Sequence, residues 1–281
     1  MDVTRPYLME NPDENRRLEV KTDPEAVRRQ AALCGIKPGM RVLDAGCGIG
    51  KTTAILHEMI QPGGSIVGVD FAGDRIRYAE QHYSAGQGIS FSLTDLRSSL
   101  DELGHFDCIW VRFVLEHYLE GSIDIIKNLS QCLNPEGILC LLDLDYNCLS
   151  HYPVSTEMEQ MLQKLIHKMM TKFNFDPYVG RKLYTYLYDL GFHDIRMDLI
   201  PHHLIYGELG SSDEFNWIKK VEMASVKAKD LFRDYPGGYE AFFADFNAFF
   251  HDPRRFTYTP LMICRGKKTG QCSRAEKDAS T

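Results

Sequence analysis

The fold of this chain is decided by the stretch Arg41-Val42-Leu43-Asp44-Ala45-Gly46-Cys47-Gly48-Ile49-Gly50. Its apolar beginning follows a Pro-Gly turn and predicts a short buried strand. Residues 51–60 carry apolar side chains at helical spacing and predict a helix. Three glycines at alternate positions lie between the two, and glycine is needed where the backbone has a positive φ or passes close to a ligand. A strand, a glycine loop and a helix N-terminus predict a nucleotide-type site at the carboxyl end of a parallel sheet.

Three classes of ligand compete for this loop. A dinucleotide-binding fingerprint, Gly-x-Gly-x-x-Gly, needs a third glycine at the position of Lys51. A phosphate-binding P-loop ends in Gly-Lys-Thr, as residues 50–52 do, but its first glycine is replaced by Ala45. The third pattern, Asp-x-Gly-x-Gly-x-Gly, begins at Asp44 and is complete. A carboxylate there repels a polyphosphate and favours a cationic ligand, so the third pattern is preferred.

Two further predicted strands also end in an acid. Residues 65–70 form an apolar run that ends at Asp70, and residues 89–94 are followed by Asp95. A carboxylate at the position of Asp70 can accept two hydrogen bonds from the hydroxyls of a ribose. Phe71 beside it supplies an apolar surface for adenine. A P-loop has no need of these acids, so the strand ends favour a nucleoside ligand.

Together these acids and glycines resemble the first motifs of the class I S-adenosylmethionine-dependent methyltransferases. The resemblance covers residues 35–145 well, and residues 112–117 are similar to small-molecule members of the ubiquinone- and menaquinone-biosynthesis type. It implies an α/β, doubly wound, Rossmann-like sheet of seven strands, mostly parallel, with the seventh antiparallel. It implies S-adenosylmethionine as cofactor and S-adenosylhomocysteine as product. The cofactor-binding residues that we expect are Asp44, Gly46, Cys47, Gly48, Gly50, Asp70, Phe71, Asp95, Leu96 and Arg112.

The composition limits the class of protein and partner. The chain has 281 residues, of which 44% are hydrophobic and 25% charged, which is ordinary for a globular protein. The net charge is -7 and no run of Lys or Arg stands out, which argues against DNA or bulk RNA as a partner. No stretch approaches the length of an apolar membrane span and no signal peptide begins the chain, so a cytoplasmic protein without membrane contact is expected. The eight cysteines lack zinc-type spacing, so no metal is expected.

Three parts follow one another along the chain. Residues 1–21 are expected to be an arm that forms a lid, as the N-terminal segment often does in this family. Residues 22–266 are the expected methyltransferase domain, and residues 267–281 a disordered tail. Thr22 and Glu25 predict a capping box at the first helix of the domain.

The domain is expected to carry additional helices. The segment 150–190 is predicted to be helical, with a Met- and Leu-rich amphipathic helix as core or cap. The insertion 208–255 is too long for a structureless loop and is also predicted to be helical. Its aromatic side chains are expected to pack on the domain, and the alternatives are a homodimer contact or a wall of the substrate site.

Methyl transfer from a sulfonium is an in-line displacement that needs neither a metal nor a covalent intermediate. A base helps where the acceptor is a hydroxyl or a protonated amine. The candidates near the carboxyl ends of the fourth and fifth strands are His117, Asp145 and Tyr146. The region left for the acceptor offers Tyr7, Arg16, Arg17 and His151. For each residue alone a structural role is an equal alternative, but as a set they suit a small polar or aromatic acceptor rather than a polyanion.

The preferred function is therefore methyl transfer to an oxygen or nitrogen atom of a small-molecule acceptor. A protein or RNA methyltransferase is the alternative with the same chemistry, and the acidic net charge weighs against it. A P-loop nucleotidase is a more remote alternative. A protein that binds the cofactor without transferring a methyl group is another.

Overall fold

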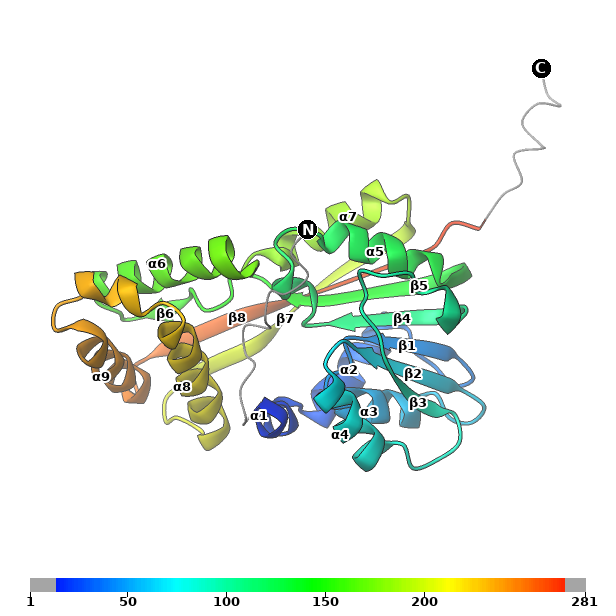
Figure 1. Cartoon of the computed structure of the whole chain (residues 1–281), viewed down its shortest axis with the longest axis horizontal. Helices are drawn as coiled ribbons and strands as arrows, with labels where there is room; N and C mark the ends of the chain where they lie inside the picture. Colours follow the sequence, from blue (N-terminus) through cyan, green and yellow to red (C-terminus); the bar gives the residue numbers. More distant parts are fainter. Residues whose placement is uncertain (1–13, 271–281) are drawn as a thin grey trace, which may run out of the picture.

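The computed structural model describes residues 14–270 (Figure 1). The strands of this part of the chain are β1 (Arg41–Ala45), β2 (Ser65–Asp70), β3 (Ile89–Leu93), β4 (Phe106–Arg112), β5 (Leu133–Leu144), β6 (His151–Tyr152), β7 (His193–Tyr206) and β8 (Phe256–Lys267). Its α-helices are α1 (Glu14–Lys21), α2 (Pro24–Cys34), α3 (Lys51–Met59), α4 (Gly73–Tyr83), α5 (Ser122–Gln131), α6 (Thr156–Phe173), α7 (Leu183–Asp189), α8 (Ser211–Val226) and α9 (Gly238–His251). Short 3₁₀ helices are η1 (Asp101–Leu103), η2 (Leu115–His117), η3 (Val179–Lys182) and η4 (Lys229–Asp234).

One sheet runs through the molecule. Its strand order is β3-β2-β1-β4-β5-β8-β6, and β7 also pairs with β8. β1 to β5 are parallel, whereas β8 is antiparallel to β5, β6 and β7. The predicted doubly wound sheet with an antiparallel strand beside the fifth is confirmed. The expected number of seven strands is corrected to eight within the described residues, because β6 is only two residues long and so leaves no alternation in the sequence.

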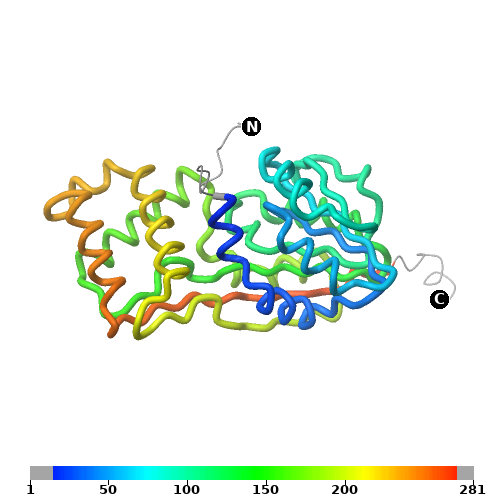
Figure 2. The backbone as a smooth tube through the Cα atoms, turned by 90° about the horizontal axis from the view of Figure 1, so that it is seen from below, coloured from blue at the N-terminus to red at the C-terminus, as the bar shows by residue number. Residues whose placement is uncertain are grey.

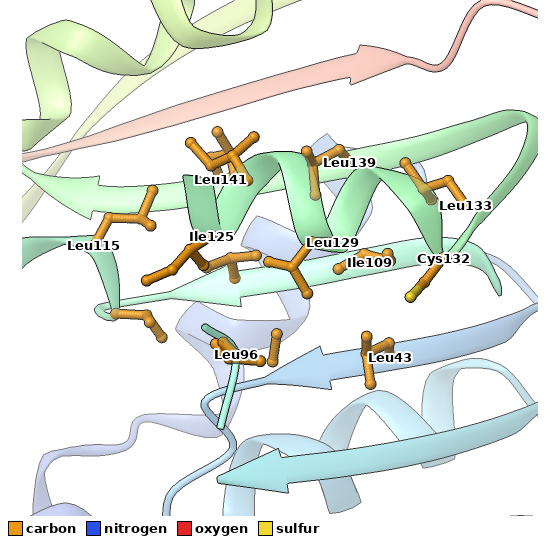
Figure 3. Close-up of a cluster of buried hydrophobic side chains, with 14 of the residues drawn as sticks. Leu43, Leu96, Ile109, Leu115, Ile125, Leu129, Cys132, Leu133, Leu139 and Leu141 are labelled. Carbon is orange, nitrogen blue, oxygen red and sulfur yellow. The ribbon is translucent and has the colours of Figure 1, made fainter. Parts of the chain in front are cut away.

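Helices cover both faces of the parallel part of the sheet, which explains why its strands are apolar on both sides. On one face α5 and α7 pack on the sheet, and Figure 3 shows Leu129 of α5 beside Leu43 of β1 and Ile109 of β4. On the other face α2 and α3 pack on it, with Leu56 in the same cluster as Val42. Neighbouring residues of β1 therefore belong to opposite layers of the core, as the two-residue repeat of a strand requires.

β7 and β8 continue beyond the parallel strands and carry a second group of helices (Figure 1). We call the group of β6, α6, α8, η4 and α9 the cap. Its core is rich in aromatic side chains: Trp217, Phe232, Tyr235, Phe242, Phe246, Phe249 and Phe250. The segment 208–255 holds α8, η4 and α9, and α1 lies between the cap and the parallel sheet (Figure 2).

The start of α2 differs from the expectation. Asp23, not Thr22, is the N-cap residue, and its Oδ1 accepts a hydrogen bond of 2.9 Å from the N–H of Glu25. The predicted capping box is wrong because α1 ends directly before Thr22. The Thr22 hydroxyl instead donates to the carbonyl of Leu18, at 2.9 Å.

The length and polarity of the helices bear on membrane contact. Within residues 14–270, no helix is long and apolar enough to cross a membrane.

Candidate cofactor and acceptor site

The loop between β1 and α3 requires glycine at two positions. Gly46 has φ 80°, and a Cβ there would lie 2.3 Å from Cγ2 of Val114. Gly50 has φ 86°, and a Cβ there would lie 2.7 Å from the Cβ of Ala79. A left-handed backbone and the lack of space both exclude a side chain. The loop is thereby held close to the segment after β4 and to α4.

Asp70, at the end of β2, organises this loop. Its Oδ2 accepts a hydrogen bond of 3.0 Å from the N–H of Gly48, and its Oδ1 one of 2.9 Å from the N–H of Ala72. Nη1 of Arg75 lies 3.7 Å from Oδ1. A carboxylate has about four acceptor positions, so Asp70 retains capacity for the hydroxyls of a ligand.

Asp44 lies deeper, behind the loop. It is buried, and its Oδ2 accepts a hydrogen bond of 2.6 Å from the Thr53 hydroxyl. Burial raises the pKa of Asp44 to about 7, although this hydrogen bond and the charge of Arg112 oppose the rise. Asp44 does not line the cavity described next, so it can act on a ligand only through its charge and through the shape of the loop.

A cavity of about 970 Å³ lies at the carboxyl ends of the parallel strands and reaches the cap. Its volume is near the upper end for small-molecule sites, so it has room for a nucleoside and a second molecule. It brings together ten of the residues named from the sequence: Arg17, Gly46, Cys47, Gly48, Asp70, Phe71, Asp95, Leu96, Arg112 and His117.

The part of the cavity near β2 and β3 suits a nucleobase. Phe71 is 47% exposed there, and Cζ of Arg75 lies 6.0 Å from the centre of its ring. Nη2 of Arg97 donates to Oδ2 of Asp95 at 2.6 Å. Arg97 keeps the pKa of Asp95 below its ordinary value. An open aromatic ring and an ionised carboxylate fit an adenine with its amino group.

Phe113, directly after β4, lies beside two cations. Its φ is 59°, a left-handed backbone that is uncommon for a bulky residue. Cζ of Arg112 lies 4.2 Å and Nζ of Lys21 lies 4.4 Å from the centre of the Phe113 ring. Nε of Arg112 also donates to Oε1 of Gln30 at 2.9 Å. Burial lowers the pKa of Lys21 to about 7, so this ammonium is easily deprotonated.

Glu116 and His117 form a polar group in the same cavity. Oε2 of Glu116 accepts a hydrogen bond of 2.7 Å from Nδ2 of Asn147, and its Oε1 lies 3.8 Å from Nε2 of His117. Behind them, Oδ2 of Asp143 accepts from the N–H of Glu116 at 3.1 Å. Burial and the charge of Glu116 raise the pKa of Asp143 well above its usual range. Burial lowers the pKa of His117 to about 4, so its imidazole is neutral at pH 7.

Three residues expected beside the acceptor lie outside this cavity. The Asp145 carboxylate pairs with Arg181, whose Nε lies 2.9 Å from Oδ1. Tyr146 and His151 line a separate cavity of about 240 Å³ beside α6. Nδ1 of His151 lies 2.9 Å from the Thr257 hydroxyl. Tyr146 has a positive φ of 54° in the turn after β5. Its side chain faces the smaller cavity, whereas Asn147 and Cys148 directly after it line the larger one.

The other expected residues are placed as follows. Arg16 points to α8, with its Cζ 5.9 Å from the centre of the Phe215 ring, and does not line the cavity. Gly50 shapes the loop without lining the cavity. Tyr7 lies outside the described residues.

Sequence patterns missed most of the cap side of the cavity. It is lined by Lys21, Glu116, Asn147, Cys148, Ile166, Met169, Phe173, Phe175, Lys220 and Ala224. Ile166, Met169 and Phe173 follow the helical repeat of α6, but this repeat also describes a residue of the core. Lys220 and Ala224 belong to α8, so the insertion 208–255 contributes to the wall of this cavity.

Comparison with known proteins establishes the family. The model of a methyltransferase domain family matches residues 36–195, which include the glycine loop and the three acidic strand ends. The chain belongs to this family. As a class I methyltransferase it has S-adenosylmethionine as its cofactor, and the P-loop and dinucleotide interpretations of residues 44–52 no longer stand.

Individual relatives of this methyltransferase are distant. YqeM of Bacillus subtilis, described as a methyltransferase, is 31% identical over 125 residues, which are 43% of this chain and 49% of that protein. Juvenile hormone acid O-methyltransferase of Bombyx mori is 24% identical over 213 residues, 71% of this chain and 72% of that protein. The chain thus spans about half the length of YqeM.

A solved structure shows the same fold. It is the phosphoethanolamine N-methyltransferase 2 of Haemonchus contortus in complex with S-adenosylhomocysteine, with a TM-score of 0.59 and 12% identity over 96% of this chain and 61% of that chain. Relatives of the ubiquinone and menaquinone type match 40% and 49% of the chain. That branch is therefore supported more weakly than the family.

Proposed function

We propose that this methyltransferase transfers the methyl group of S-adenosylmethionine to an oxygen or nitrogen atom of a small-molecule acceptor. The observation that carries the proposal is the extent of the cavity, which continues from the glycine loop to a part walled by α1, α6 and α8. A polypeptide or an RNA strand would have to pass these three helices, whereas a small molecule fits between them. The protein or RNA alternative is therefore less well supported.

The cofactor would be held by the residues at the strand ends. Asp70 would accept hydrogen bonds from the ribose, the Phe71 ring would cover the adenine, and Asp95 would accept from its amino group. Cys47 would contribute a small side chain beside Gly46 and Gly48. When bound, the cofactor supplies an electrophilic methyl group on a sulfonium.

The role of the protein in the reaction is to position the acceptor and to exclude water. The apolar side chains of α6 would hold the acceptor against the cofactor side. His117 is the one catalytic candidate from the sequence that lines the cavity. Because its pKa is about 4, it would act as a hydrogen-bonding partner for the acceptor rather than as a strong base. Arg17 would take part in binding the acceptor.

We also propose that residues 1–21 act as a lid on the domain 22–266. The described part of this arm, α1, contributes Arg17, Leu18 and Lys21 to the cavity. It is tied to α3 through Glu19, whose carbonyl accepts a hydrogen bond of 2.6 Å from Nζ of Lys51. A short helix held mainly by polar side chains can open at low free energy.

Ligand binding tests the proposed function. Thermal unfolding should be shifted upward by S-adenosylhomocysteine and not by Mg-ATP, since a ligand at 100 times its Kd stabilises by about 2.7 kcal/mol. Stabilisation by Mg-ATP alone would overturn the proposal.

A substitution at Asp70 sharpens this test. Asp70→Ala should weaken the binding of S-adenosylhomocysteine by about 1.5–3 kcal/mol, the range for hydrogen bonds to a charged group, as measured by calorimetry. Asp74→Ala is the matched control, because Asp74 lies on the neighbouring turn and pairs with Arg77 at the surface. Equal affinities of the Asp70 variant and the unmodified protein would mean that the ribose is held elsewhere.

A further inference from the structure

Among the described residues, the charged side chains on the cap side of the cavity that are shielded from solvent are more often positive than negative. Arg17, Lys21 and Lys220 line it, and Glu116 is the buried carboxylate beside them. Glu120 and Asp124 also line the cavity, but both are exposed, and solvent screens exposed charges.

The two lysines differ from most lysines of this protein in their partners. Nζ of Lys21 lies 4.4 Å from the centre of the Phe113 ring, and Nζ of Lys220 lies 4.7 Å from that of Trp217. Within residues 14–270 neither forms an ion pair with a carboxylate, whereas several lysines elsewhere do: Lys51, Lys164, Lys168 and Lys182. Two half-buried ammonium groups held on aromatic rings, without a paired carboxylate, have their charge compensated only in part.

Apolar side chains line the same cavity as these cations. Ile166, Met169 and Phe173 of α6, Phe175 after it and Ala224 of α8 form this part of the lining. An apolar wall beside cations that lack a paired carboxylate fits a molecule that has one anionic end and an apolar body.

Resting on the proposed function, we infer that the acceptor is an organic monoanion, a carboxylate on an apolar body. Its carboxylate lies at Lys21 and Lys220, and its body lies against α6. The anion offsets the cost of the half-buried ammonium groups, which a neutral or cationic acceptor does not. The buried Glu116 compensates part of the positive charge, so the site suits one negative charge rather than a polyanion.

The reaction of a carboxylate fits the polar groups of this cavity. One carboxylate oxygen attacks the methyl carbon, so a C–O bond forms while the C–S bond breaks and leaves its electron pair on sulfur. The products are a methyl ester and S-adenosylhomocysteine. No proton is released and no base is needed, which agrees with the weak basicity of His117.

Proton uptake should accompany the binding of the anion. The Lys21 ammonium faces Arg17 on its own helix, Lys220 of α8, Arg112 of β4 and Glu116 of η2. Burial and the three cations lower the pKa of Lys21 to about 7, and Glu116 opposes this. A bound carboxylate stabilises the ammonium form and raises this pKa, so the affinity for the anion should fall as the pH rises above 7.

Three eight-carbon probes test the charge preference. Octanoate, octanol and octylamine are titrated by calorimetry into the full-length protein saturated with S-adenosylhomocysteine. Octanoate should bind at least about tenfold more tightly than the other two, and its binding should take up protons, seen as a dependence of the heat on the buffer at pH 7.5. Octylamine or octanol binding as tightly as octanoate would overturn the inference.

Substitutions on α8 test whether the carboxylate binds at Lys220. Lys220→Met should weaken octanoate binding at least about tenfold with unchanged affinity for S-adenosylhomocysteine, and Lys220→Arg should retain octanoate binding. Lys219→Met is the matched control, because Lys219 is on the same helix, pairs with Glu222 and does not line the cavity. If octanoate bound equally to Lys220→Met and to the unmodified protein, the carboxylate would not bind at Lys220, and the inference would be overturned. If S-adenosylhomocysteine itself did not bind, the proposed function would fail instead.

Discussion

The two sides of the cavity are built in different ways. On the cofactor side, backbone hydrogen bonds place the loop: the N–H groups of Gly46 and Cys47 both donate to the carbonyl of Val69, at 2.8 and 2.9 Å. On the cap side, side chains from α1, α6 and α8 meet through packing. A site made by backbone needs particular residues at fixed spacing, whereas a site made by side chains can be formed by many sequences.

The buried charges of the two sides differ as well. On the cofactor side, burial raises the pKa of the acid Asp44 to about 7. On the cap side, burial lowers the pKa of Lys21 to about 7 and that of His117 to about 4. In each case burial disfavours the charged form. A ligand that restores the charge must therefore be cationic near Asp44 and anionic near Lys21.

The largest effect is expected from Gly46→Ala on the cofactor side. The new Cβ meets Val114 at 2.3 Å and the backbone has φ 80°. Left-handed strain of about 1–2 kcal/mol and overpacking of about 1–3 kcal/mol should lower the free energy of unfolding, and binding of S-adenosylhomocysteine should be lost. Urea denaturation and calorimetry measure the two effects.

Gly39→Ala is the control for this substitution. Gly39 has φ 84°, but a Cβ there has nothing within 4 Å, so only the strain of the backbone remains. Equal destabilisation by both substitutions would mean that the contact between the loop and Val114 does not constrain the site.

A pH-dependent effect of intermediate size is expected from Asp44→Asn. The pKa of Asp44 is about 7 in the folded protein and about 3.9 in an unfolded chain. Between these values the folded state binds more protons than the unfolded state, so a rise in pH destabilises the protein. From pH 4 to pH 7 the free energy of unfolding should fall by about 3 kcal/mol more in the unmodified protein than in Asp44→Asn.

Urea denaturation of both proteins at several pH values checks this difference, and Asn can still accept the hydrogen bond from Thr53. Parallel pH profiles would show that the pKa of Asp44 is the same in the folded and the unfolded protein. In that case the contrast between the buried charges of the two sides would disappear.

The cofactor side could be predicted from the sequence because its constraints are local. Gly46, Gly50 and Asp70 are required by the backbone around them, and apolar runs such as residues 65–70 predict the strands. The spacing along the chain then places these residues at one edge of the sheet, without knowledge of the rest of the fold.

The cap side could not be predicted in the same way. Lys21 and Lys220 are brought together by the packing of α1 against α8, and no motif joins two positions so far apart. Asp145 and Tyr146 were expected at the acceptor because they follow a strand, but Asp145 pairs with Arg181 and Tyr146 lines the separate cavity beside α6. The positive φ of Tyr146 could not be predicted from the local sequence, because residues other than glycine seldom have a positive φ.

The smallest effect on the cofactor side should come from the deletion of residues 1–18, which tests whether the two sides are separable. The deletion removes Arg17 and most of α1 but retains Glu19, whose carbonyl accepts a hydrogen bond from Lys51 in the full chain. The affinity for S-adenosylhomocysteine should change by less than about tenfold (roughly 1.4 kcal/mol), because Asp70 and the glycine loop are untouched. Methyl transfer to the acceptor should be greatly reduced, because one wall of the cap side is lost. If calorimetry instead showed a loss of cofactor affinity as large as that of Asp70→Ala, α1 would be part of the cofactor site and the two sides would form a single unit.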